Sequence, residues 1–154
     1  MVEAMSLIGY DALTLGRMDL ALGLDVLKER QAEASFPFLS ANVVSLTDKK
    51  PFFQPYIILE RQGVRIGIIG LSEPQAAQVP GLSDQAIVLN PADAASQYVS
   101  ELRDKVDILI LLSHLGLEED KALARTVPGI DIIVGGNTRQ LMRQPEQVGN
   151  TLIV

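Results

Sequence analysis

Five polar side chains stand where this chain could do chemistry, because each follows an apolar segment or a glycine turn. His114, the only histidine, directly follows an apolar run, and Asn137 and Arg139 follow another apolar run and two glycines. Arg17 follows a glycine after a further expected strand, and Asn42 ends a strand of its own. The carboxyl ends of strands in an α/β sheet meet at one crevice, so we expect these side chains to converge. An imidazole and an amide oxygen can bind a metal, and a guanidinium pairs with phosphate or carboxylate.

The elements that must position these side chains are predicted by short apolar runs that alternate with helical patterns. Strands are expected at residues 36–44, 56–60, 64–71, 106–113 and 130–134, with a hairpin joining the second and third. Helices are expected at about residues 19–34, 90–105 and 118–127, the second of them capped by Asn90. Residues 73–84 are expected to form an exposed loop, because prolines and a glycine interrupt any regular element there. This order of elements predicts an α/β fold whose later half is mostly a parallel sheet.

Composition and charge limit the classes of function. The chain has 154 residues, which predicts one domain spanning residues 1–154, and its formal net charge is −6. A negative chain is a poor non-specific partner for nucleic acid, because such binding depends on Lys and Arg. Cysteine is absent, so disulfides and Cys-based zinc sites are excluded. No apolar run reaches the roughly 20 residues that a bilayer span needs, so no membrane partner is expected.

Five short motifs follow one another along the chain. They are Tyr-Asp-Ala at 10–12, Ser-Ala-Asn at 40–42, Ile-Gly-Ile-Ile-Gly at 66–70, Ser-His-Leu-Gly at 113–116 and Gly-Gly-Asn-Thr-Arg at 135–139. In this order and spacing the chain resembles the metallophosphoesterase (calcineurin-like) catalytic domain of the 5'-nucleotidase family, over roughly residues 5–154. The resemblance implies a layered α/β/β/α sandwich whose first strands and upstream metal motifs would precede this chain. Residues 151–154 are similar to the strand that follows the last motif in the family.

The same resemblance implies a site that has lost most of its chemistry. A two-metal phosphoesterase centre needs ligands such as Asp, Asn and His, which hold two cations and a bridging hydroxide. Set against the family motifs, Arg17 stands at a ligand Asn, Met18 at the catalytic His, Ala21 at the Asp that orients it, and Asn137 and Arg139 at two His positions. His114 and Asn137 are then the remaining candidates for metal ligands. The resemblance therefore predicts a degenerate domain that does not catalyse and that holds no cofactor.

Two roles are open for the arginines at these positions. Arg17 and Arg139 would project toward the crevice, where they either neutralise aspartates carried upstream or bind a phosphate or carboxylate ligand. Asn42 likewise either ends its strand with hydrogen bonds to backbone or contacts a ligand. The alternative function, from another class, is a metal-dependent phosphohydrolase that acts on nucleotides or other phosphate esters. It would require Mn or Zn around His114 and ligands from an upstream segment.

The first strands of the family domain would precede this chain, and their absence would affect how the chain associates with other chains. A central strand without its neighbour presents an unpaired edge and apolar surface, so we expect a homo-oligomer or association with a missing N-terminal segment. The first residues carry neither the basic start nor the apolar stretch of a signal peptide. The compartment is therefore left open: extracytoplasmic if a longer parent protein carries a signal peptide upstream, and otherwise cytoplasmic.

Overall fold

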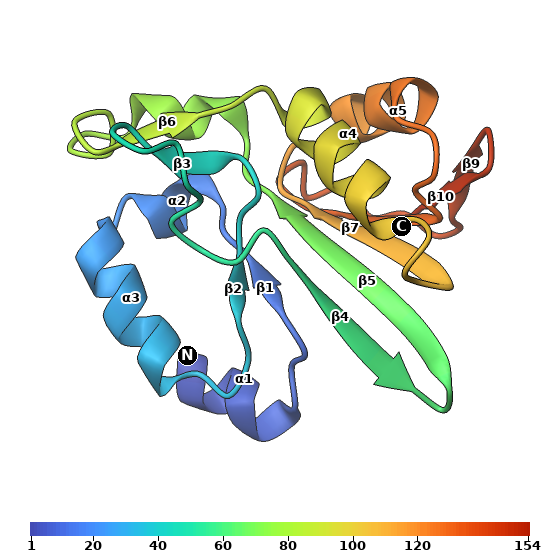
Figure 1. The fold of residues 1–154 in the computed structure, drawn as a ribbon, viewed down its shortest axis with the longest axis horizontal. Coiled ribbons are helices and arrows are strands. Elements are labelled where there is room, and N and C mark those ends of the chain that lie inside the picture. Colours follow the sequence, from blue (N-terminus) through green and yellow to red (C-terminus); the bar gives the residue numbers. More distant parts are fainter.

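The computed structural model describes residues 1–154, and its largest element is a six-stranded sheet (Figure 1). The strands lie in the order β4-β5-β7-β8-β10-β9. Their bounds are Tyr56–Arg61 for β4, Val64–Leu71 for β5, Ile108–Ser113 for β7, Ile132–Gly135 for β8, Glu146–Val148 for β9 and Thr151–Ile153 for β10. Strands β5, β7, β8 and β10 are parallel, whereas the edge strands β4 and β9 run antiparallel to their neighbours. The carboxyl ends of the parallel strands therefore meet at one edge of the sheet.

A second group of short elements lies on the left of Figure 1. Strand β1 (Leu13–Thr14) pairs in parallel with β2 (Phe38–Leu39), and β3 (Val43–Ser45) pairs antiparallel with β6 (Ala86–Val88). The helices of this group are α1 Val2–Ile8, α2 Arg17–Leu20, α3 Leu24–Glu33 and the 3-10 helix η1 Pro74–Gln78. Twelve buried apolar residues form a separate core among these elements.

Helices α4 (Pro91–Leu102) and α5 (Leu117–Thr126) pack on one face of the six-stranded sheet (Figure 1). Alternate residues of β7, such as Leu109 and Leu111, point to this face and are fully buried with Leu102 of α4. This is the packing that alternating strands and amphipathic helices produce, because each element buries its apolar side against the other. The predicted α/β fold class is confirmed.

Two predicted local features are also confirmed. The side-chain oxygen of Asn90 accepts hydrogen bonds from two backbone N–H groups in the first turn of α4, at 2.8 and 3.3 Å, and so caps that helix. The hairpin between β4 and β5 turns at Gln62 and Gly63, whose φ angles are 53° and 80°. Positive φ at both central residues is what a two-residue type I′ hairpin turn requires.

The opposite face of the six-stranded sheet is apolar, and neither α4 nor α5 covers it. One row of aligned residues across five strands is aliphatic throughout: Ile57, Ile68, Ile110, Ile132 and Leu152. None of the five belongs to either core cluster; Leu152 is 40% exposed, whereas Ile68 is only 8% exposed. We call this row and its neighbours the aliphatic face.

Two elements that the sequence predicted as continuous are interrupted. The helix expected at residues 19–34 is split into α2 and α3, because Gly23 takes a φ of 89° immediately before α3. The strand expected at residues 36–44 is two short strands, β2 and β3. Between them, the backbone N–H groups of Ser40 and Ala41 bond to Gln54 and Gly70, which turns the chain toward the end of β5.

The prediction of an exposed loop at residues 73–84 was wrong. This segment contains η1, and its side chains Ala76, Val79 and Leu82 are only 0%, 5% and 3% exposed. The prolines stop a longer element, but the apolar residues between them still enter the core beside α2 and β6. Helix α1 is an element that the apolar pattern did not predict.

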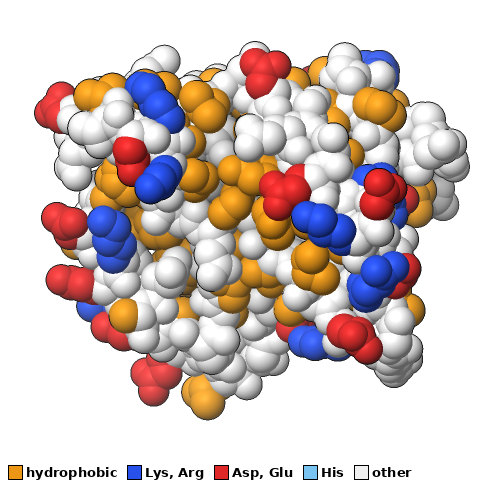
Figure 2. Space-filling view, in the orientation of Figure 1, with side chains coloured by type: hydrophobic (Ala, Val, Ile, Leu, Met, Phe, Trp, Pro, Cys, Tyr) orange, Lys and Arg blue, Asp and Glu red, His pale blue; other side chains and the backbone are white.

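Apolar and charged side chains occupy different parts of the molecular surface. On the face drawn in Figure 2, apolar side chains gather near the centre, and most charged side chains lie toward the left and right margins. No helix of the structure combines the length and the apolar character that crossing a membrane demands.

Candidate functional site

Six side chains line a cavity of about 370 Å³ at the carboxyl ends of β5, β7 and β8. They are Arg17, Met18, Glu73, His114, Asn137 and Arg139, and we call this space the strand-end cavity. Three of them lie within two residues of a strand end: Glu73 after β5, His114 after β7 and Asn137 after β8. The convergence expected from the sequence is therefore found for Arg17, His114, Asn137 and Arg139.

A buried carboxylate fixes the histidine in this cavity. Glu73 is only 5% exposed in its side chain, and its Oε2 lies 2.8 Å from Nδ1 of His114. Its other oxygen, Oε1, accepts the backbone N–H of Arg17 at 3.0 Å. Because a carboxylate accepts hydrogen bonds, this contact places the ring proton on Nδ1 and leaves Nε2 without a proton in the neutral imidazole.

The glycine before α2 leaves room for the imidazole ring. A Cβ added to Gly16 would lie 2.6 Å from both Cε1 and Nε2 of His114, which is closer than real Cβ atoms approach. The backbone N–H of Gly16 donates to Asp19 at 3.0 Å, so Asp19 closes the start of α2 instead of facing the cavity. The glycine-marked turn therefore serves close packing against His114.

The turn after β8 carries backbone strain. Asn137 and Arg139 have φ angles of 75° and 52°, a left-handed region that residues other than glycine rarely adopt. The side-chain nitrogen of Asn137 donates to the backbone carbonyls of His114 and Leu115, at 3.3 and 3.4 Å. Strained conformations of this kind cluster at binding sites, where the surrounding structure holds them in place.

The two arginines of the strand-end cavity have no partner within the chain. Only the backbone N–H of Arg17 is engaged, by Glu73, and the guanidinium groups of Arg17 and Arg139 make neither a hydrogen bond nor an ion pair. Arg103, by contrast, holds Asp131 at 2.6 Å. The two cavity arginines are therefore free to pair with a ligand.

Two residues singled out from the sequence lie outside the cavity. Ala21 follows α2 and is exposed to solvent. Asn42 is completely buried, where its Oδ1 accepts the backbone N–H of Ser72 at 2.9 Å and its Nδ2 donates to the carbonyl of Ser72 at 2.8 Å. Of the two roles open for Asn42, the geometry is that of a side chain bonded to backbone.

Glu73 is the site residue that the sequence reasoning missed. It was placed within a loop expected to be exposed, although it follows the buried strand β5 by two residues. The same positional rule that selected His114 after β7 would have selected it, because both strands are parallel and end at the same edge.

Comparisons with known proteins agree with this fold. No family model matches the chain. A protein named UshA from Yersinia enterocolitica is 34% identical over 153 residues, which cover 89% of this chain and 28% of that protein. A 5'-nucleotidase from Vibrio cholerae is 34% identical over 154 residues, covering 90% of this chain and 28% of its own length.

Solved structures show the same likeness in three dimensions. The 5'-nucleotidase precursor of Thermus thermophilus superposes with a TM-score of 0.89 at 32% identity, over 97% of this chain and 34% of that one. The sulfate thiohydrolase SoxB of Thermus thermophilus superposes with a TM-score of 0.90 at 28% identity, over 99% of this chain and 29% of that one. This chain is a 5'-nucleotidase-like metallophosphoesterase domain. It spans about 28% of the length of the curated relatives that it matches.

The donor set of this 5'-nucleotidase-like domain does not fit a two-metal centre. Such a centre holds two cations with several Asp, Asn and His side chains. No group of three or more His, Asp or Glu side chains of this chain lies close enough to hold a metal. Nδ1 of His114 already faces Glu73, and Met18 offers only a soft thioether, which hard cations do not select. These residues by themselves therefore do not make the metal site.

A buried aspartate of the 5'-nucleotidase-like domain bonds to the last residue of β7, which precedes His114. Asp120, in the first turn of α5, is completely buried, and its Oδ1 accepts the hydroxyl of Ser113 at the end of β7. Burial raises the pKa of Asp120 to about 6, because the charged carboxylate loses water, and the hydrogen bond from Ser113 opposes that rise. Its Oδ2 has no hydrogen-bond partner. The hydrogen bond between Ser113 and Asp120 ties α5 to β7, the strand that directly precedes His114.

Proposed function

We propose that this 5'-nucleotidase-like domain binds a phosphate or carboxylate anion and does not hydrolyse phosphate esters. The observation that supports anion binding is the pair of unpaired guanidinium groups, Arg17 and Arg139, in one cavity. A guanidinium stays charged at every physiological pH and presents a planar fork of donors that matches both kinds of anion. It can supply the positive charge that two metal ions supply in an active phosphoesterase.

The charge inside the cavity favours such a ligand. Glu73 is the one acidic side chain that lines it, and both of its oxygens already accept hydrogen bonds, from His114 and from the backbone of Arg17. The negative charge of Glu73 is therefore turned toward the wall, while Arg17 and Arg139 lie at the exposed side. An anion entering from solvent meets the arginines first.

The absence of catalysis is supported by what stands at the family's reactive positions. Met18 lines the cavity where the resemblance places the catalytic His, and a thioether neither gives nor takes a proton. Ala21, at the position of the orienting Asp, is exposed and carries no polar group. Incubation with 4-nitrophenyl phosphate and either Mn or Zn is expected to release no product above a blank.

Calorimetric titration with inorganic phosphate, in a buffer with EDTA, tests the anion site. We expect binding, and we expect Arg17→Ala and Arg139→Ala each to weaken it by about tenfold or more, since a charged hydrogen bond contributes about 1.5–3 kcal/mol. The matched control is Arg125→Ala, an exposed arginine in the last turn of α5 that does not line the cavity. Unchanged affinity in both cavity variants would exclude the proposal.

The second candidate is a metal-dependent phosphohydrolase, which the names of the matched relatives favour. It acts on nucleotides or other phosphate esters only if a segment outside this chain completes the ligand set with Mn or Zn. Titration of the chain with Mn and with Zn, beside His114→Ala, distinguishes the two. Tight binding that is lost in His114→Ala favours this candidate, and no binding favours the anion site.

We also propose that the chain associates with a second copy through the aliphatic face. Its central row is aliphatic on five neighbouring strands and packs in neither core cluster. Light scattering at rising protein concentration is expected to show dimers, and Leu152→Lys, at a 40% exposed position of that row, is expected to weaken them. A monomer at every concentration contradicts this proposal.

A further inference from the structure

One buried carboxyl group contacts both of the turns that carry the cavity side chains. Asp120 of α5 is completely buried, and its Oδ1 accepts the hydroxyl of Ser113, the residue before His114. Its Oδ2 lies over Gly135, where an added Cβ would come within 2.8 Å of it. Gly135 ends β8 and leads into the turn that carries Arg139. Asp120 therefore contacts the two strand ends that shape the strand-end cavity.

Hydrogen bonds extend from Asp120 into the cavity turns. The Oγ of Ser113 donates to Asp120 and accepts the backbone N–H of Leu115 at 3.2 Å. The backbone carbonyls of His114 and Leu115 accept the side-chain nitrogen of Asn137, at 3.3 and 3.4 Å. A continuous series of hydrogen bonds thus runs from Asp120, through the residues on either side of His114, to the turn after β8.

The surroundings of Asp120 suit a neutral carboxyl group better than a charged one. Its Oδ2 has no hydrogen-bond partner. A buried carboxylate oxygen without a donor is costly, because it has lost water and gained no hydrogen bond in exchange. Burial accordingly raises the pKa of Asp120 to about 6. The carboxyl group therefore changes its charge between mildly acidic and neutral pH.

The charged groups around Asp120 are few. The elements packed against α5 are β8, β9 and β10, with β7 reached through a hydrogen bond. On α5 itself, the charge of Glu119 favours the neutral form of Asp120, and Lys121 is held by Glu118 and by Glu146 of β9. The other strands contribute side chains without charge: Ser113, Gly135, Ile153 and Val154.

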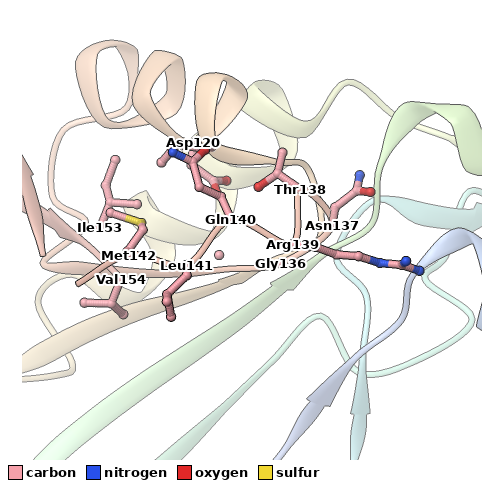
Figure 3. Close-up of a pocket in the computed structure, with 12 residues that line it drawn as sticks. Asp120, Gly136, Asn137, Thr138, Arg139, Gln140, Leu141, Met142, Ile153 and Val154 are labelled. Carbon is pink, nitrogen blue, oxygen red and sulfur yellow. The ribbon is translucent and has the colours of Figure 1, made fainter. Parts of the chain in front are cut away.

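Arg139 is the one cationic side chain that lines a cavity together with Asp120. It lines both the strand-end cavity and a neighbouring cavity of about 420 Å³ that Asp120 also lines. Figure 3 shows the Arg139 side chain extending away from Asp120. A negative charge on Asp120 attracts this guanidinium toward the neighbouring cavity and repels an anion in the strand-end cavity. Both effects oppose anion binding.

We propose that Asp120 regulates the anion site: the domain binds its anion tightly while Asp120 holds a proton and weakly once that proton is lost. The inference rests on the proposed anion site and adds its regulation. Because coupling between two binding sites is reciprocal, a bound anion also makes Asp120 keep its proton to a higher pH.

Sulfate is the probe, because it carries two negative charges from pH 5 to 8, whereas phosphate itself titrates in this range. Imidazoles also titrate here, so the deciding comparison holds the pH at 8 and changes only Asp120. In calorimetric titrations at constant ionic strength, we expect Asp120→Asn to bind sulfate about tenfold more tightly than the parent chain. The amide cannot ionise, and it keeps an oxygen that can accept the hydroxyl of Ser113.

An exposed aspartate provides the matched control. Asp93 lies in the first turn of α4, as Asp120 lies in that of α5, and it lines neither cavity. Asp93→Asn removes one negative charge from the chain, as Asp120→Asn does at pH 8. It is expected to leave the affinity for sulfate unchanged, because water screens an exposed charge.

The reciprocal effect is measured on the carboxyl group itself by carbon-13 NMR. We expect saturating sulfate to raise the titration midpoint of Asp120 by about one pH unit, the counterpart of a tenfold change in affinity. A second variant, Ser113→Ala, removes the hydrogen bond that opposes the rise in the pKa of Asp120. The pH at which sulfate affinity falls should therefore move upward in Ser113→Ala.

The outcomes distinguish the inference from the proposed function. Equal sulfate affinity in Asp120→Asn and the parent chain at pH 8, the same gain in Asp93→Asn, or a titration midpoint that sulfate leaves unchanged overturns the inference and leaves the anion site in place. Failure of the parent chain to bind sulfate or phosphate at pH 5 and at pH 8 overturns the anion site itself. Tighter binding in Asp120→Asn alone supports the inference.

Discussion

The two ends of the parallel strands use the same kind of side chain in opposite ways. At the amino ends, Arg65 and Arg103 are held by aspartates that precede the strands, whereas at the carboxyl ends Arg17 and Arg139 have no partner. Both ends belong to one sheet, so the difference does not come from the fold class. It separates arginines that fasten the structure from arginines that are available to a ligand.

The amino-end pairs are complete in geometry. Arg65 makes a two-point contact with Asp107, from Nη2 at 2.8 Å and from Nε at 3.2 Å. Arg103 donates to Asp131 at 2.6 Å and also to three backbone carbonyls. Arg103 makes four hydrogen bonds within the chain and Arg65 makes two, so each has less capacity left for an anion from solvent than Arg17 or Arg139.

Two aspartates show the same contrast in their pKa values. The hydrogen bond and charge of Arg65 lower the pKa of Asp107 to about 2. At the carboxyl end, burial raises the pKa of Asp120 to about 6, because no cation compensates the lost water. An aspartate beside a guanidinium is stabilised in its charged form, and a buried one without a cation is not.

The largest expected effect is the loss of stability when a paired arginine at the amino ends is replaced. Arg103→Met should lower the free energy of unfolding by about 2–3 kcal/mol, because Asp131 and three carbonyls lose a partly buried donor. Arg139→Met, the matched change at the other end, should cost less than about 0.5 kcal/mol, since no partner is lost. Urea unfolding measures both, and equal losses would mean that the two ends do not differ as described.

The pH dependence of stability should have two limbs of opposite sign. Below pH 4 the free energy of unfolding falls as pH drops toward 2. The pKa of Asp107 is lowered in the folded protein, so in this range the unfolded chain takes up a proton that the folded protein does not. Between about pH 4 and 6 it falls as pH rises, because the folded protein holds a proton on Asp120, with its pKa of about 6, that the unfolded chain releases.

The second limb amounts to a few kcal/mol, on the order of 1.4 kcal/mol for each unit by which the pKa of Asp120 is raised. Urea unfolding at pH 4, 5, 6 and 7 measures it. Asp120→Asn is expected to flatten the profile over this range while keeping the limb below pH 4. If the fall in stability between pH 4 and 6 persists in Asp120→Asn, another titrating group causes it.

A smaller loss is expected from filling the space beside the imidazole. Gly16→Ala places a methyl 2.6 Å from the His114 ring and should lower the free energy of unfolding by about 1–2 kcal/mol as the ring moves aside. The same change in a His114→Ala background should cost less, because the ring is gone, and a double-mutant cycle measures the difference. Additive costs would show that the clash is not with His114.

The smallest effect on stability should come from Glu73→Gln, which keeps the shape of the side chain. Its main consequence is on His114, because an amide no longer favours the proton on Nδ1 as a carboxylate does. Nitrogen-15 NMR of the imidazole above pH 8 is expected to show a protonated Nδ1 in the parent chain and a mixture of tautomers in Glu73→Gln. Identical spectra would mean that Glu73 does not orient the ring.

Sequence reasoning was most successful where local patterns are strong. The apolar runs of β5, β7 and β8, the Asn90 cap and the Gln62-Gly63 turn each express a local preference that the fold keeps. Placing His114, Asn137 and Arg139 in one cavity followed from the rule that parallel strands end at one edge.

It failed where contacts distant in sequence decide the conformation. Glu73 is buried because His114, which lies 41 residues away, and the backbone of Arg17 bond to it, and neither contact is visible in a segment with two prolines. Ser40 and Ala41 leave their predicted strand because Gln54 and Gly70 offer other partners. Gly23 was expected only to weaken the start of the first long helix, but its positive φ splits that helix into α2 and α3.

The measurement that tests the central claim most directly is a phosphate titration of the parent chain and of the double variant Arg17→Ala/Arg139→Ala, each with EDTA and again with Mn. If guanidinium groups supply the charge, the parent chain binds phosphate equally well under both conditions, and the double variant loses binding under both. Phosphate that binds only after Mn is added, with equal affinity in both chains, would contradict the account and restore the metal-dependent phosphohydrolase.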